Sequence, residues 1–165
     1  MAARRIVVAV IGGQHAEPDV LRDAEEVGRR IATAGAVLAC GGLGGVMEAA
    51  CRGAKDAGGS TVGILPGADA SEANRHVDLA IVTALGTARN VVLVRTADAI
   101  IAIDGAFGTL TEMAHALEQG KRVVSLGSWD LRKIGVGADR ILEARNPEEA
   151  VRLAIAEASR ARPQA

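Results

Sequence analysis

Three glycine-bearing segments of the chain could bind an anion through their backbone amides. They occupy residues 12–13, 41–45 and 105–108, and each follows a short apolar run typical of a buried strand. A glycine loop that leads into a helix offers free N–H groups and no Cβ that would keep a phosphate away. The sequence also leaves open that glycine only permits tight turns here. We expect phosphate contacts from Gly12, Gly13, Gly41, Gly42, Gly44, Gly45, Gly105 and Gly108.

Two charged side chains could do chemistry at such a site. Glu112 lies one turn into the helix expected after Gly108, where a carboxylate could serve a ligand's sugar or activate a water. Arg89 lies near the start of another expected helix, and a cation there is unfavourable against the helix dipole unless an anion accompanies it. A phosphate or Glu112 would supply that anion. The structural alternative for Glu112 is a capping box, because Thr109-Leu-Thr-Glu112 fits that pattern.

The remaining reactive residue types form no second site. No cluster of His, Asp and Glu has the spacing of metal ligands, so we predict no metal. His15 follows the first glycine pair and could touch a ligand. Cys40 is expected to be a small buried apolar side chain. A lysine that forms a Schiff base with pyridoxal phosphate is not expected either, because no site surrounds Lys55, Lys121 or Lys133.

The elements that must position these residues alternate between strand and helix. Apolar runs of four to seven residues separate helical patterns, which predicts one three-layer α/β domain over residues 1–165, with a mostly parallel sheet of six or seven strands. Ligands of such sheets bind outside the carboxyl ends of the strands. We expect the 41–45 and 105–109 loops, on neighbouring strands, to hold the same anion. The expected strands are 5–11, 36–40, 60–65, 79–83, 99–103, 122–126 and 140–143; the expected helices are 18–34, 46–57, 86–97, 109–119 and one from 147, with a frayed tail from about 159.

Composition excludes several classes of partner. The chain has 165 residues and a formal net charge of -1, so it lacks the positive field that nucleic-acid backbones require. Aromatic residues make up 1%, too few for a single-strand stacking platform. No apolar run approaches the roughly 20 residues of a membrane span, and we expect no signal peptide before the first strand. We therefore expect a cytoplasmic protein that binds neither nucleic acid nor membrane. The 41–45 loop is not a P-loop, which disfavours ATP hydrolysis.

Three motifs resemble those of the LOG (lonely guy) family, a Rossmann-like, doubly wound superfamily often labelled "lysine decarboxylase". They are Gly41-Gly-Leu-Gly-Gly-Val-Met-Glu48, Arg89-Asn90 and Asp104-Gly-Ala-Phe-Gly-Thr-Leu-Thr-Glu112, and the resemblance spans about residues 5–126. LOG enzymes hydrolyse the N-glycosidic bond of cytokinin nucleoside 5′-monophosphates and release the base and ribose 5-phosphate. The resemblance implies that Gly108, Thr109 and Asn90 bind the phosphorylated ligand. It also implies that Arg89 and Glu112 are catalytic and that no cofactor is required.

Some segments depart from the LOG pattern. Where the family has Pro-Gly-Gly, this chain has Asp104-Gly105-Ala106. Where the family has His-x-Arg-Lys, this chain has Thr87-Ala-Arg-Asn90. Segments 63–66, 80–83 and 88–90 look more like the molybdenum-cofactor-carrier branch, whose members bind a phosphorylated pterin without turning it over. That branch also retains the Arg and the Glu, so this pair does not separate enzyme from carrier.

The leading hypothesis from the sequence is a nucleoside-monophosphate phosphoribohydrolase. The alternative is a non-catalytic carrier with the molybdenum cofactor as cargo, and a weaker one is a nucleotide-sensing module. The resemblance further implies a homodimer or homotetramer, with the Arg89 helix and the helix after Gly108 as its candidate face.

Overall fold

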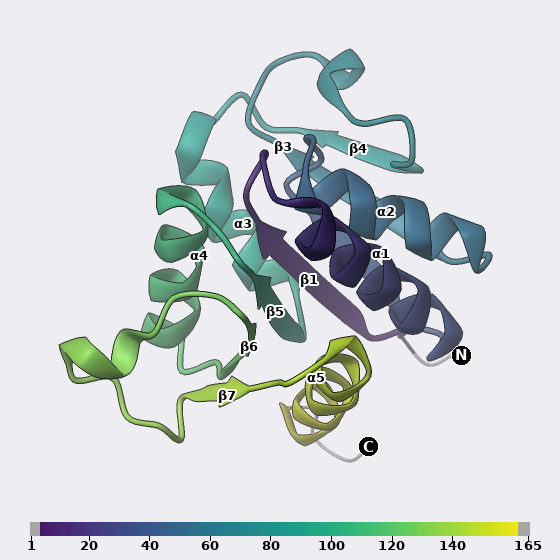
Figure 1. Cartoon of the computed structure of the whole chain (residues 1–165). Helices are drawn as coiled ribbons and strands as arrows, with labels where there is room; N and C mark the ends of the chain where they lie inside the picture. The colour runs from purple at the N-terminus through teal and green to yellow at the C-terminus, as the bar shows by residue number, and fades with distance from the viewer. Residues whose placement is uncertain (1–3, 162–165) are drawn as a thin grey trace.

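All seven strands of the sheet run parallel, in the order β4-β3-β2-β1-β5-β6-β7. This computed structural model describes residues 4–161 (Figure 1). The strands predicted from the sequence are confirmed, including the short seventh one. Their bounds are β1 Val7–Gly12, β2 Val37–Cys40, β3 Ser60–Leu65, β4 Leu79–Val82, β5 Ala99–Ile103, β6 Val123–Leu126 and β7 Ile141–Glu143.

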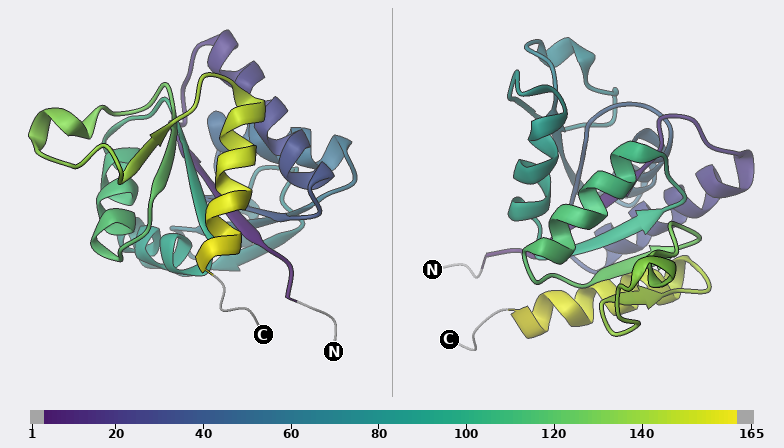
Figure 2. Two further views of the ribbon diagram at one scale, coloured as in Figure 1. Left: turned by 90° about the horizontal axis from the view of Figure 1, so that it is seen from below. Right: turned by 90° about the vertical axis from the view of Figure 1, so that its left-hand side faces the viewer.

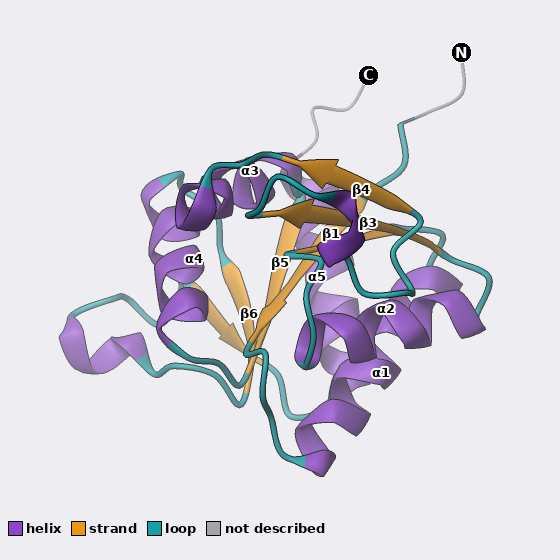
Figure 3. Ribbon diagram, turned by 90° about the horizontal axis from the view of Figure 1, so that it is seen from above, coloured by secondary structure: helices purple, strands orange, loops and turns teal. Residues whose placement is uncertain are grey.

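Helices cover both faces of the sheet and complete the three predicted layers (Figure 3). One face packs against α1 (Pro18–Thr33), α2 (Val46–Asp56) and α5 (Pro147–Ala161). The other packs against α3 (Arg89–Thr96) and α4 (Phe107–Glu118). Side chains of the central strand alternate between these two cores, because successive strand residues point to opposite faces. Figure 2 shows α5 lying beside α1.

Three helix ends differ from the expected ones. The helix expected over 86–97 begins with a 3-10 turn, Gly86–Ala88, and its α-helical part starts at Arg89. The helix after the 105–108 loop starts at Phe107, two residues early. Residues 159–161, where the sequence predicts the start of a frayed tail, belong to α5, and the Ser159 hydroxyl donates to the Ile155 carbonyl at 2.9 Å. Residues 162–165 lie outside the described part of the chain.

The sheet reverses its winding at β1. From β1 the chain proceeds through β2, β3 and β4 on one side, and β5, β6 and β7 lie on the other. Such a switch point leaves a crevice at the carboxyl ends of the strands. The expectation that the loops after β2 and β5 follow neighbouring strands is therefore wrong. β1 and its glycine pair lie between them.

Candidate functional site

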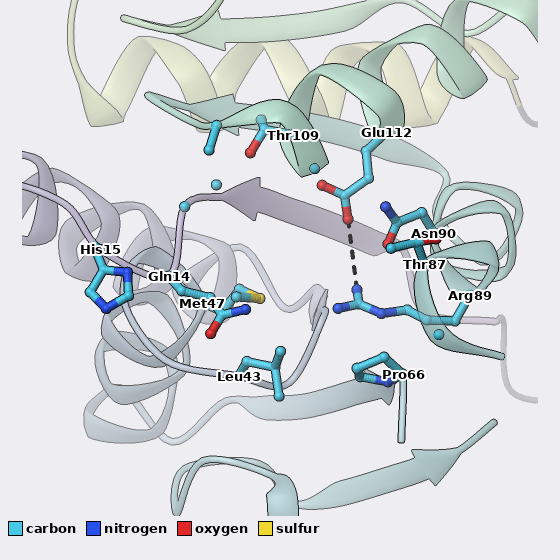
Figure 4. Close-up of a pocket in the computed structure, with 15 residues that line it drawn as sticks. Gln14, His15, Leu43, Met47, Pro66, Thr87, Arg89, Asn90, Thr109 and Glu112 are labelled. Carbon is cyan, nitrogen blue, oxygen red and sulfur yellow. Dashed lines mark ion pairs between the residues drawn. The ribbon is translucent and has the colours of Figure 1, made fainter. Parts of the chain in front are cut away.

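A pocket of about 570 Å³ lies at this switch point. Its walls come from the loops after β1, β2, β3 and β5, from the 3-10 turn Gly86–Ala88 and from the N-terminal halves of α2, α3 and α4 (Figure 4). The pocket therefore forms where the topology places the crevice. It is lined by Gly12, Gly13, Gln14, His15, Leu43, Met47, Pro66, Gly86, Thr87, Arg89, Asn90, Ala106, Gly108, Thr109 and Glu112.

The N-terminus of α4 is open toward the pocket. Ala106 is its N-cap residue, and no side chain of the described residues caps this end. The first N–H groups of a helix have no partner within the helix, so they and the helix dipole favour an anion there. Thr109 in this first turn is 2% exposed, and its Oγ1 is buried without a hydrogen-bond partner among residues 4–161. Figure 4 draws that hydroxyl toward the pocket. A buried unpaired hydroxyl is costly, and an acceptor oxygen of a ligand would satisfy it.

The capping-box alternative for Glu112 is wrong. Because α4 begins at Phe107, Thr109 is its third residue and Glu112 its sixth, too deep to reach the N-cap amide. Glu112 instead lines the pocket from inside the helix. The early start follows from Ala106, which is extended and already ends the strand-to-helix turn.

Arg89 and Glu112 form a buried ion pair across the pocket wall. Their Nη1 and Oε1 atoms are 3.7 Å apart, and the residues are 7% and 6% exposed. Burial raises the pKa of Glu112 from 4.5 to about 7, and the Arg89 charge opposes this rise. Burial also lowers the pKa of Arg89, although a guanidinium keeps its proton in proteins. Its Nε is buried without a hydrogen-bond partner in the described part of the chain. The pair therefore brings one fixed cation and one carboxyl that titrates near neutrality.

The expected site glycines divide into two groups. Gly12, Gly13 and Gly108 line the pocket, together with Asn90 at the start of α3. Gly41, Gly42, Gly44, Gly45 and Gly105 lie outside that lining and have packing roles or open surroundings.

Two of the glycines outside the lining make room for pocket side chains. A Cβ on Gly41 would come within 2.4 Å of the Arg89 Nη1, so its absence admits the guanidinium. A Cβ on Gly105 would lie 2.5 Å from the Cβ of Thr109, at a φ of +125° that side chains rarely adopt. Gly41 and Gly105 therefore leave the space that the Arg89 and Thr109 side chains occupy at the pocket.

The 41–45 loop is held by contacts that sequence reasoning missed. The Asn74 backbone N–H donates to the Gly42 carbonyl at 2.8 Å, and its Nδ2 donates to the Leu43 carbonyl at 2.9 Å. The Gly42 N–H donates to the Cys40 Sγ at 3.3 Å. Cys40 itself is buried, as expected from the sequence. Asn74 lies in the loop between β3 and β4, and no motif in that loop signals this role.

Asp104 adopts a backbone conformation that proline cannot share. Its φ is +48°, whereas the proline ring fixes φ near −65°. This chain therefore builds the turn after β5 differently from a Pro-Gly-Gly loop. The Asp104 carbonyl accepts a hydrogen bond from the Ser128 hydroxyl. Asp104 does not line the pocket, whereas Ala106 does.

Several residues that line the pocket were not among the site residues expected from the sequence. His15 was expected near the ligand and lines the pocket. The unexpected residues share one feature, their position: each lies just beyond the carboxyl end of a strand or at the start of a following helix. The residues missed by sequence reasoning are Gln14, Leu43, Met47, Pro66, Gly86, Thr87 and Ala106.

Residues 4–161 contain no group of three or more His, Cys, Asp or Glu arranged to hold a metal. They also contain no helix long and apolar enough to cross a membrane. No lysine of this part of the chain lines the pocket. Lys55 pairs with Asp78 at 2.6 Å, and Lys121 donates to the carbonyl of Ala97, also at 2.6 Å.

Fold and site together define a Rossmann-like α/β protein with a pocket at the switch point of its sheet. The chain belongs to the SLOG cluster4 family, which it matches over residues 5–157. This membership confirms the resemblance to the LOG superfamily that the three motifs carried.

Similar proteins place the chain within the superfamily. A protein of Archaeoglobus fulgidus, described as uncharacterized, is 43% identical over 148 residues, which cover 90% of this chain and 93% of that protein. The molybdenum cofactor binding protein of Rippkaea orientalis has a TM-score of 0.86 and 38% identity, with 94% of this chain and 98% of that chain covered. The molybdenum cofactor carrier protein of Chlamydomonas reinhardtii has a TM-score of 0.82 and 34% identity, with 93% and 99% covered. These neighbours confirm the branch that the sequence resembles.

Replacing Glu112 with Gln should change how stability depends on pH. The pKa of Glu112 is about 7 in the folded chain against an ordinary value of 4.5, so the wild type gains stability from this proton below about pH 4.5 and loses that gain as the pH rises through 7. The Glu112→Gln variant has no such proton. Its free energy of unfolding relative to wild type should therefore increase across this pH range, as measured by urea denaturation at several pH values.

The matched control is Glu143→Gln, because Glu143 is an exposed carboxyl at the end of β7. This control should follow the wild type at every pH. If the free energy of unfolding of Glu112→Gln differs from that of the wild type by the same amount at every pH, a buried carboxyl with a pKa of about 7 is contradicted.

Proposed function

We propose that the protein binds a phosphorylated small molecule in this pocket, with the phosphate at the N-terminus of α4. One observation carries this proposal: the buried Thr109 Oγ1 has no partner among the described residues and lies in the uncapped first turn of the helix. A phosphate would accept hydrogen bonds from that hydroxyl and from the free N–H groups of the turn. The Arg89 guanidinium adds a positive charge in the same cavity.

Within this proposal, the molybdenum cofactor is the ligand that the similar proteins favour, and it would be cargo. Two solved structures that cover at least 93% of this chain, at 38% and 34% identity, are described as a molybdenum cofactor binding protein and a molybdenum cofactor carrier protein. A carrier needs an anchor for the cofactor's phosphate and a cavity for the attached ring system. It needs no reacting group. This ranking reverses the order of the two hypotheses from the sequence.

The second candidate function, hydrolysis of a nucleoside 5′-monophosphate, is supported by the Arg89–Glu112 pair. A carboxyl with a pKa of about 7 is half ionised near neutral pH, which suits a general acid or base. As a carboxylate it would activate a water or stabilise an oxocarbenium-like centre, while Arg89 would assist the departing base. In a carrier, the same pair would only contact the bound ligand and would take no part in a reaction.

Removing the Thr109 hydroxyl should weaken phosphate binding without destabilising the protein. Because Oγ1 has no partner within residues 4–161, Thr109→Val should leave the melting temperature unchanged or raised. Its affinity for ribose 5-phosphate, measured by calorimetry, should fall by about 10-fold or more, which is the usual value of a hydrogen bond to a charged group.

The control for this variant is Thr111→Val, because Thr111 is exposed on the same helix and donates to the Phe107 carbonyl at 2.9 Å. The control should bind ribose 5-phosphate as the wild type does. Equal affinities of the wild type, Thr109→Val and Thr111→Val for ribose 5-phosphate would contradict a phosphate site at the N-terminus of α4.

A turnover assay separates the two functions. The purified protein is incubated with AMP and with cytokinin nucleoside monophosphates, and free base is measured. The carrier function predicts no release of base, together with saturable binding of the molybdenum cofactor. Release of base that Glu112→Gln abolishes, with affinity for ribose 5-phosphate retained, would establish the hydrolase instead.

A further inference from the structure

The two cysteines of the chain contact one another in the interior. Cys40 ends β2 and Cys51 lies in the middle of α2, and their Sγ atoms are 3.5 Å apart. Both are free thiols, and both side chains are fully buried. The sulfurs of a disulfide are about 2.05 Å apart, so a bond between these two requires a relative movement of about 1.5 Å. The pair is therefore placed to be oxidised together.

The surroundings make Cys40 the more acidic thiol of the two. Its hydrogen bond with Cys51 lowers the pKa of Cys40, and burial opposes this effect. The Gly42 N–H, which donates to the Cys40 Sγ at 3.3 Å, and the Arg89 charge lower this pKa further. The hydrogen bond with Cys40, together with burial, raises the pKa of Cys51. Since the thiolate is the nucleophilic form of cysteine, Cys40 is the group that reacts first.

Cys40 lies close behind the wall of the pocket. The next residue is Gly41, where a Cβ would come within 2.4 Å of the Arg89 Nη1 and 2.8 Å of the Met47 Sδ. Both of these side chains line the pocket, and Met47 belongs to the same apolar cluster as the two cysteines. Because both thiols are covered, we expect only a small oxidant such as a hydroperoxide to reach them.

We propose that Cys40 and Cys51 form a redox-active dithiol, which a hydroperoxide oxidises to a disulfide that weakens binding in the pocket. The Cys40 sulfur attacks one oxygen of hydrogen peroxide and the O–O bond breaks, which gives a sulfenic acid and one water. The Cys51 sulfur then attacks the Cys40 sulfur and loses its proton, and the sulfenic oxygen leaves as a second water. Two thiols and one peroxide thus give one disulfide and two waters, with the thiols oxidised and the peroxide reduced.

The disulfide acts on the pocket through Gly41 and Arg89. Joining the two sulfurs draws the end of β2 toward α2, and a densely packed core passes such a shift to its neighbours. The Arg89 guanidinium fills the space beside Gly41, so it moves relative to the Glu112 carboxyl, 3.7 Å away. A bound phosphate needs this charge in place. The effect on binding therefore rests on the proposed function, whereas the oxidation itself does not.

The oxidation is tested by the mass of one peptide. Trypsin cleaves after Arg30 and Arg52 and nowhere between them, so residues 31–52 form a single peptide that contains both cysteines. The folded protein is treated with hydrogen peroxide and then denatured in iodoacetamide. The peptide should have lost two hydrogen atoms and taken up no alkyl group. The same peptide from untreated protein should carry two alkyl groups.

The effect on the pocket is tested by calorimetry with ribose 5-phosphate. The oxidised protein should bind this ligand at least about 5-fold more weakly than the reduced protein, which is the lower end of typical coupling between two sites. Peroxide also oxidises methionine, so the affinity is measured on protein in which the same peptide shows Met47 unmodified. The matched control is the double variant Cys40→Ala/Cys51→Ala, which keeps every methionine. Peroxide should leave the affinity of this variant as it was before treatment.

The outcomes distinguish this inference from the proposed function. The dithiol is overturned if both cysteines of the treated wild type are alkylated, or if the peptide gains oxygen and loses no hydrogen; this result needs no variant. The coupling to the pocket is overturned if the disulfide leaves the affinity for ribose 5-phosphate unchanged, or if the double variant loses affinity equally. Failure of the reduced wild type to bind ribose 5-phosphate would overturn the proposed function and the coupling, while the peptide mass would still decide the dithiol.

Discussion

The reversal of the sheet at β1 is the constraint on which the site depends. Because β2 and β5 lie on opposite sides of β1, the loops that leave these strands diverge, and a crevice opens above the glycine pair of β1. Helix α4 then starts at one wall of that crevice, and the 41–45 loop forms part of the other. The N-terminus of α4 and the side chains of Leu43 and Pro66 therefore lie on opposite sides of the pocket (Figure 4).

Burial gives the Arg89–Glu112 pair its character. Both side chains leave water, and for Glu112 the cost of burying a charge outweighs the attraction of Arg89 at 3.7 Å. The result is a carboxyl that can lose or keep its proton at neutral pH with little change in free energy. Such a group tolerates a neighbouring phosphate better than a permanent carboxylate would, because protonation removes the repulsion. This property suits a carrier as well as a hydrolase.

Much of the fold was predictable from the sequence, because each strand is a short apolar run and glycines mark many of the turns. Arg89 and Glu112 were also predictable, since their charges lie near helix starts that point to the same edge. The start of α4 was not, because Thr109-Leu-Thr-Glu112 matches a capping pattern and the local sequence does not show that Ala106 is already extended. The roles of Gly41 and Gly105 also depend on tertiary contacts, with the Arg89 guanidinium and the Thr109 side chain respectively. Leu43 lies in the 41–48 motif and Pro66 in the 63–66 segment, but neither was expected to line the site, because only the strand order brings them into one pocket.

The most direct test of this account is a crystal structure of the protein soaked with AMP. The account predicts the phosphate within hydrogen-bonding distance of the Thr109 hydroxyl and the first amides of α4. Density for the phosphate on the 41–45 loop or outside the pocket, with the Thr109 hydroxyl still unpartnered, would contradict it.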